Sequence, residues 1–529
     1  MAWLHTWTGL LVGWLLLLIF MAGTASYYRE EISRWMRPEL PRNTVSNEVA
    51  AERAIAFLQH KAPQAESWNV TLPDPRNPAM RMFWRNPESM VKPPAEGEKR
   101  RRRGGGRFGD ATVDPGTGEE VAARETRGGD FFYRLHFDLH YIPVYWARYL
   151  VGFCAMFMLV AIITGVITHK KIFKDFFTFR PRKGQRSWLD GHNAVGVLVL
   201  PFHLMITYSS LVIFMSMVMP APIVASYGDD SRAFFSELFP ATDNAPALGQ
   251  PGKLLPLMPM YQQAREQWAG GHVGRVAVNN PGDANASVNV SRAGSDSVVH
   301  ASGSTLSFNG TTGELLRGSA EPSLATAIGG SFYGLHMGHF AGPVLRWLYF
   351  ICGLAGTAMI GTGLVIWLGK RQLKHAKASV MPFELRLVEV LNIASMSGLM
   401  IAIAAFFWAN RLLPVSFAAR SDWEVQAFFI AWGLSLLHAL LRRGRQGWVE
   451  QLSFGALLFA AIPLLNAITT AHHLGVSVPN GDWAMAGFDL TCLASGMFLA
   501  WAAWKMHHRT APQPKAERAR GLTLKQQAH

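Results

Sequence analysis

Eight stretches of mostly apolar residues punctuate the chain from one end to the other. A helix that crosses a bilayer needs about 20 such residues, so each stretch is a candidate membrane span. The predicted spans are residues 6–27, 143–168, 192–219, 343–368, 386–409, 424–441, 450–471 and 485–504. Half of the 529 residues are hydrophobic, and the pattern therefore predicts a polytopic α-helical membrane protein rather than a soluble enzyme.

Two long polar stretches, residues 28–135 and 220–331, separate the first four spans. Each stretch combines an amphipathic helix with short alternating strands that are bounded by Pro, Asn and Gly turns. The expected elements are a helix at 47–61 and strands at 68–72, 80–84 and 111–113 in the first stretch, and a helix at 259–268, strands at 273–278 and 287–291 and a hairpin at 305–316 in the second. We expect two small α+β modules outside the membrane.

The first four spans and their modules carry a repeated motif. Residues 132–136 read Phe-Tyr-Arg-Leu-His and residues 332–336 read Phe-Tyr-Gly-Leu-His, each just before an apolar stretch. Upstream, His5 and His192 each follow a Trp-Leu pair and precede a glycine by four residues. This self-similarity indicates an internal duplication of the first four helices, related by an axis along the membrane normal. The last four spans contain no copy of these motifs.

These patterns predict a division of the chain into spans, modules and loops. The expected segments are helix 1 (1–27), module 1 (28–135), helix 2 (136–168), a basic loop (169–190), helix 3 (191–219), module 2 (220–331), helix 4 (332–368), a loop (369–385), a four-helix C-terminal block (386–506) and a tail (507–529). The first apolar stretch lacks the basic start of a cleaved signal peptide, and we expect it to be retained.

Lysine and arginine residues gather on one side of the predicted topology. The loops 169–190, 369–385 and 442–449 and the tail are rich in them, whereas the loop 472–484 has none. By the positive-inside rule, both termini are expected to be cytoplasmic and both modules to lie on the outer side. The formal net charge of +14 then reflects topology and contact with lipid headgroups, not binding to nucleic acid.

Four histidines recur at matching depths in the two halves. His5 and His192 are expected at the cytoplasmic ends of helices 1 and 3, and His136 and His336 at the outer ends of helices 2 and 4. Histidines from facing helices commonly bind haem iron, so the duplication predicts two bis-histidine haem b sites, one near each membrane face. A single histidine at a helix end is often only a hydrogen-bonding residue, and the recurrence is what favours ligation.

Other histidines compete with these four as ligands. His140 and His339 lie close to His136 and His336 and would replace them, while His203 in helix 3 and His169 at the end of helix 2 would bind iron or relay protons. The three cysteines all fall within apolar stretches, so no disulfide framework or thiolate metal site is expected. The sequence singles out no further catalytic residue.

The motifs resemble those of the PepSY-associated transmembrane family. The resemblance rests on Trp-Leu-His-x-Trp-x-Gly-Leu at residues 3–10, on Arg-Leu-His-Phe-Asp-Leu-His at residues 134–140, and on the twin α+β modules with their Gly-Glu turns, and it covers roughly residues 1–375. It implies a bacterial inner-membrane protein with periplasmic PepSY-like modules that reduces ferric-siderophores through bound haem. The four extra helices depart from the basic four-helix form.

The leading hypothesis is therefore electron transfer from a cytoplasmic or quinol donor to ferric iron in a siderophore or other chelate. Two alternatives stay open: a non-catalytic protein whose modules bind partner proteins, and a transporter for iron chelates or metal ions. Haem b, one or two per chain, is the expected cofactor, and a homo-oligomer is one of the expected assemblies.

Overall fold

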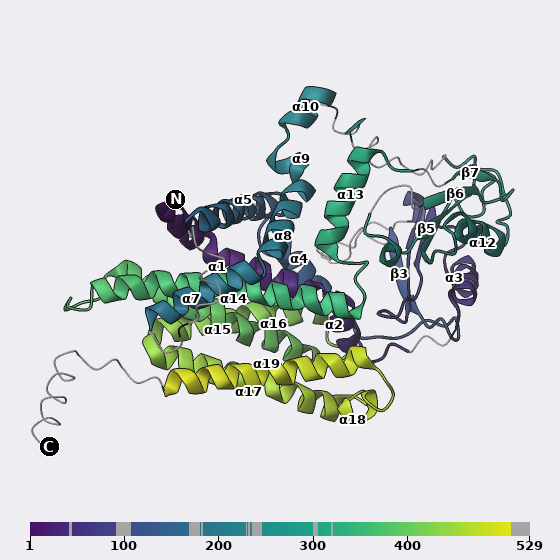
Figure 1. Cartoon of the computed structure of the whole chain (residues 1–529). Helices are drawn as coiled ribbons and strands as arrows, with labels where there is room; N and C mark the ends of the chain where they lie inside the picture. Colours follow the sequence, from purple (N-terminus) through teal and green to yellow (C-terminus); the bar gives the residue numbers. More distant parts are fainter. Residues whose placement is uncertain are drawn as a thin grey trace, which may run out of the picture.

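In the computed structural model, the helices form a bundle and one β-sheet lies at its end (Figure 1). The structure describes residues 1–41, 45–90, 107–168, 180, 184–228, 230, 233–234, 246–299, 305–318 and 321–508. Within these, seven helices are long and apolar enough to cross a membrane, or eight spans with one bent pair. They are α1 (Ala2–Ser26), α5 (Val144–Thr168), the bent pair α7 (Gln185–Leu198) and α8 (Leu200–Ile213), α14 (Pro343–Lys374), α15 (Phe383–Leu412), α16 (Arg420–Leu441), α17 (Gly444–Thr469) and α19 (Trp483–His507). The predicted polytopic fold is confirmed.

The third span is not the continuous helix that its apolar length predicts. α7 and α8 meet at an angle of 67°. Val199 between them has a non-helical ψ of 15°, and Pro201 in the first turn of α8 has no amide hydrogen to continue the ladder of α7. A further break at Phe214 separates the short α9 (Met215–Val218).

The two motif histidines of the outer side lie on separate helices, which corrects the prediction that they end the second and fourth spans. His136 belongs to α4 (Asp130–Asp138) and His336 to α13 (Leu324–Met337). Leu139 has a left-handed backbone with φ of 49°, and a proline begins α14. Because proline cannot continue a preceding helix, each histidine helix stops before the span that follows it.

The two predicted modules share one seven-stranded antiparallel sheet with the order β3-β2-β1-β4-β5-β6-β7. The strands are β1 (Ser67–Thr71), β2 (Met80–Arg85), β3 (Phe108–Val113), β4 (Val273–Asn279), β5 (Ser287–Arg292), β6 (Thr305–Asn309) and β7 (Leu315–Arg317). The halves join where β1 pairs with β4, with Val70 opposite Val276. Each module thus supplies the edge that completes the other.

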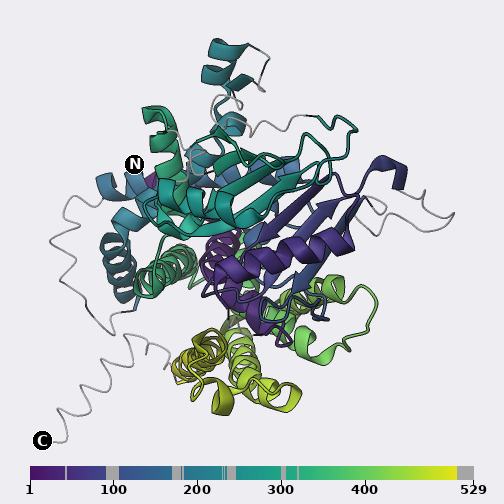
Figure 2. The same cartoon turned by 90° about the vertical axis from the view of Figure 1, so that its right-hand side faces the viewer.

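One face of the sheet carries its hydrophobic core. Alternate strand residues such as Trp68, Val276 and Phe308 are buried beneath α3 (Asn47–Lys61) and α12 (Leu257–Gln267). The hydroxyl of Ser46 caps α3 by accepting from the amide of Val49. These two helices cover the side of the sheet that faces away from the bundle (Figure 2). The opposite side faces the membrane helices.

The C-terminal block, α15 to α19, packs along one side of the duplicated bundle (Figure 1). Its buried residues, among them Leu399, Phe406 and Phe459, belong to the same apolar core as α1 and α4. Short helices complete the described chain: α2 (Arg29–Trp35), α10 (Ala221–Tyr227) and α18 (Leu474–Ser477), with single turns at Glu88–Met90 and Gly294–Asp296.

Candidate functional site

The first predicted histidine pair lies at the end of the bundle that is remote from the sheet. The rings of His5 on α1 and His192 on α7 have centroids 6.3 Å apart and planes at 73°. The His5 Nδ1–H donates to the carbonyl of Ala161 at 2.8 Å, and the His192 Nδ1 lies 3.0 Å from the carbonyl of Met359. The structure therefore brings these two side chains together and fixes the orientation of both rings.

The second predicted pair lies at the sheet end of the bundle. The rings of His136 and His336 have centroids 6.1 Å apart and planes at 45°. The His136 Nδ1–H donates to the carbonyl of Ile19 at 2.8 Å, and the His336 Nδ1 lies 2.8 Å from the hydroxyl of Ser209, which itself donates to a carbonyl of α8. The His136 ring is thus held by α1, the helix that bears His5. The His336 ring is held by α8, which continues the span that begins with α7 and His192.

The geometry of both pairs fits one iron bound between two imidazoles. With Fe–N bonds of about 2 Å, two axial imidazoles place their ring centroids roughly 6 Å apart. In every ring Nδ1 makes a hydrogen bond, so Nε2 would be the nitrogen that binds a metal. Burial also lowers the pKa of His136 and, to about 3, that of His336, so that both stay neutral, the state that binds metal.

Three of the four imidazoles pack against glycines that the sequence reasoning did not single out. A Cβ at Gly23 would lie 2.7 Å from the His136 ring, and one at Gly165 or Gly363 would lie 3.2 Å from His5 or 3.4 Å from His192. Gly165 and Gly363 each follow a threonine. This Thr-Gly repeat in the second and fourth spans is the sequence pattern that could have identified these glycines. Glycine lets each ring approach the facing helix closely. Gly9 and Gly196, which follow His5 and His192 by one turn, have open surroundings: nothing lies within 4 Å of the Cβ position of Gly9, and the Met359 sulfur lies 3.6 Å from that of Gly196.

The two pairs are well separated along α1. His5 lies on its first turn, and the carbonyl that receives His136 belongs to Ile19, fourteen residues later. At a rise of 1.5 Å per residue this is about 21 Å, most of the thickness of a bilayer core. The pairs therefore occupy two levels, as the sequence predicts.

A large cavity opens beside the sheet-end pair. Its volume is about 2080 Å³, and it lies between the inner face of the sheet and the ends of the membrane helices. His136 and His336 line its membrane side, and Arg76, Arg275 and Arg346 are among the side chains around it. The cavity gives a ligand on the sheet side direct access to the second pair.

The competing histidines that the structure describes have surroundings unlike those of the four motif histidines. His140 stacks on Phe429 with centroids 5.5 Å apart, and a Cβ at Gly294 would lie 3.8 Å from the His339 side chain. His203 is 1% exposed, its Nε2 has no hydrogen-bond partner, and its ring meets Phe20 edge to face. His169 lies outside the described residues. Among those residues, no group of three or more His, Cys, Asp or Glu side chains forms a metal cluster.

The position of His203 yields a test of which histidines act as ligands. The duplication places Leu16 where the second half has His203, so His203 has no equivalent histidine in the first half. The variant His203→Leu is expected to keep its full cofactor content and, because it removes a buried nitrogen without a partner, to be as stable as the wild type or more stable by about 1–3 kcal/mol. Cofactor-to-protein ratio and thermal denaturation measure this. Loss of one cofactor would assign ligation to His203 instead.

Comparisons with known proteins agree with the resemblance noted in the sequence. Residues 2–370 match the family described as PepSY-associated TM region. An uncharacterised protein of Pseudomonas aeruginosa is 26% identical over 395 residues, which cover 71% of this chain and 94% of that protein. The family match takes in both histidine pairs and the whole sheet and stops within α14, before the C-terminal block. Since it spans well over half of the chain, the protein belongs to the PepSY-associated transmembrane family.

Proposed function

We propose that the protein is a haem-containing reductase of a bacterial inner membrane, which carries electrons across the bilayer to ferric iron in a chelate, with a periplasmic ferric-siderophore as the preferred substrate. The observation that carries the proposal is the pairing of four histidines at two levels, with ring centroids 6.3 and 6.1 Å apart. In this proposal the sheet is periplasmic and both termini are cytoplasmic, in accordance with the distribution of basic loops.

The residues of each pair have defined roles in this scheme. Haem b held at each pair would supply reversible one-electron chemistry. His5 and His192 would receive electrons on the cytoplasmic side from a partner or a quinol, and His136 and His336 face the cavity where a chelate would dock. The Nδ1 hydrogen bonds to backbone and hydroxyl oxygens orient each ring and raise its basicity as a ligand.

Reduction also accounts for the release of iron. Siderophores bind Fe³⁺ through hard oxygen donors, which hold Fe²⁺ much less tightly because of its lower charge. One electron delivered to the chelated Fe³⁺ gives Fe²⁺, which leaves the ligand without any bond of the ligand being broken. No further catalytic side chain is required by this step.

The test is an optical spectrum of the full-length protein purified from haem-replete cells, before and after dithionite. We expect a Soret band at roughly 410–430 nm that shifts and sharpens on reduction, with about two haems per chain. After removal of dithionite, a ferric chelate should reoxidise the protein while an Fe²⁺ indicator develops colour. A colourless protein would instead support the partner-binding alternative, and uptake into vesicles without any redox change would support a transporter.

A further inference from the structure

The segment that leads into α4 is held by the C-terminal block as well as by α2 of its own half, where the Ser33 hydroxyl accepts from the amide of Gly129. The hydroxyl of Thr126 donates to the carboxylate of Glu424 on α16 and accepts from the amide of Gly128. Arg420 donates to the carbonyl of Glu125 at 3.0 Å, and Ser421 donates to the Glu125 carboxylate at 2.9 Å. Every one of these contacts acts within six residues of the start of α4.

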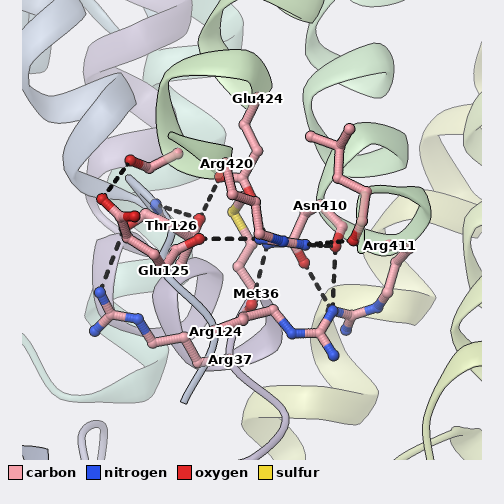
Figure 3. A network of polar contacts seen from close by, with 12 residues as sticks. Met36, Arg37, Arg124, Glu125, Thr126, Asn410, Arg411, Arg420 and Glu424 are labelled. Carbon is pink, nitrogen blue, oxygen red and sulfur yellow. Dashed lines mark hydrogen bonds and ion pairs between the residues drawn. The ribbon is translucent and has the colours of Figure 1, made fainter. Parts of the chain in front are cut away.

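The partners on the block form a buried ionic network (Figure 3). Arg420, Glu424 and Asn410 are each 0% exposed, Arg420 and Glu424 form an ion pair, and Asn410 donates to Glu424 at 2.7 Å. Arg124 donates to the carbonyl of Asn410 at 3.1 Å. If one residue of such a network moves away, its buried partner is left without a hydrogen bond, which costs stability. The network therefore holds its residues in one arrangement.

Aromatic packing fixes the helix itself on the same block. Phe131 of α4 stacks on Phe406 with centroids 4.7 Å apart and meets Phe428 edge to face at 5.1 Å. Its neighbour Phe132 packs against Phe406 and Phe407. The exposed fractions of Phe131 and Phe132 are below 5%. One face of α4 is therefore seated on α15 and α16 while the other presents His136.

The duplicated helix of the second half is different at the decisive position. In the aligned motifs, Ser331 stands where the first half has Phe131. α13 packs chiefly on α8, and its Phe332 contacts Tyr208 of that helix. Of the two duplicated helices, only α4 thus has the phenylalanine that packs on the C-terminal block, although the second half also touches the block where α14 packs on α15.

We propose that the C-terminal four-helix block is a positioning device for His136: it holds α4, and through α4 one of the two imidazoles of the sheet-end site. The inference rests on the proposed function only for the identity of the group that His136 binds. The contacts from Glu424 through Thr126 to α4 do not depend on the proposed function. The two ligands of the sheet-end site are therefore supported differently. α15 and α16 support α4, which bears His136, and α8 supports α13, which bears His336.

The variant Thr126→Val tests this link, because it keeps the shape of the side chain and removes only the hydroxyl. Amide hydrogen exchange in α4 of the full-length protein should become faster by roughly tenfold, while exchange in α13 stays unchanged. The midpoint potential and the low-spin electron paramagnetic resonance signal of the sheet-end haem should shift, and those of the remote haem should not.

Thr470→Val is the matched control. The Thr470 hydroxyl donates to Asn466 and accepts from the amide two residues later, as that of Thr126 does, yet it lies at the end of α17. The inference predicts no change in α4 or in either haem for this variant. Should Thr126→Val fail to fold, Ser421→Ala removes a milder contact to the same segment and replaces it.

The outcomes separate the two proposals. Unaltered α4 exchange together with unaltered signals from both haems in Thr126→Val overturns the positioning role and leaves the reductase standing. Equal effects of Thr126→Val and Thr470→Val also overturn it, since the change would then be a general loss of stability. A wild-type protein without haem refutes the reductase, while the exchange experiment still decides whether the block holds α4.

Discussion

Alanine at any one of His5, His136, His192 and His336 is expected to lower the haem content from about two to about one per chain, because each haem would lose one of its two axial imidazoles. Replacing one member of each pair should remove both haems. The two members of a pair should give the same spectrum, since they affect the same site. Pyridine haemochrome assays and reduced-minus-oxidised spectra of the purified variants measure this.

The flanking histidines supply the controls for that experiment. His140 and His339 lie within four residues of the sheet-end ligands, but the equivalent positions of the other half hold Phe340 and Leu139 instead of a histidine. The variants His140→Ala and His339→Ala should therefore both retain two haems. A result in which His140→Ala loses a haem and His136→Ala keeps it would refute the assignment at this level. Equal haem content in all single variants would refute the bis-histidine scheme altogether.

The second large effect is expected at Gly334, inside the repeated motif of the second half. A Cβ there would lie 1.7 Å from the carbonyl oxygen of Val298, which belongs to the backbone and cannot rotate away. Gly334→Ala must therefore push α13 off the segment that follows β5, at a cost of about 1–3 kcal/mol or more. Since His336 lies two residues further on, the sheet-end haem should be lost or perturbed together with stability.

Gly329→Ala is the matched variant for this prediction. It is the same substitution on the same helix, but nothing lies within 4 Å of its Cβ position. Alanine favours a helix over glycine by up to about 1 kcal/mol, so this variant should be slightly more stable than the wild type. Thermal denaturation and haem content of the two proteins give the comparison, and equal behaviour would mean that α13 is free to move away from Val298.

Much of the architecture follows from patterns that are local in the sequence. Long apolar stretches predict membrane helices because a bilayer core imposes a minimum length, and all eight predicted spans have a counterpart in the structure. The helix α3 has the predicted bounds, 47–61, and the Ser46 side chain that caps it lies within one turn of its start. The pairing of His5 with His192 and of His136 with His336 was predictable because a duplication implies an axis, and equivalent residues meet across it.

Other features depend on contacts that no local pattern records. Nothing near Ser67 indicates that its strand pairs with a strand that ends at Asn279. Pro201 lies at the break between α7 and α8, but Pro463 lies inside the unbroken helix α17. A proline alone therefore does not predict where a span breaks. The packing of Phe131 against Phe428 likewise joins residues far apart in the sequence, so it can be recognised only in the folded structure.

The join between β1 and β4 has a consequence for how the chain is made. β1 has a partner on one side when the first module emerges, and its other edge stays bare until more than two hundred further residues have been synthesised. Two candidate membrane spans, α5 and the bent pair of α7 and α8, lie in that interval, so the sheet of the first half cannot reach its final form by itself. An unpaired strand edge is prone to join the wrong neighbour, and this protein is therefore expected to need shielding by chaperones while its own second half is still on the ribosome.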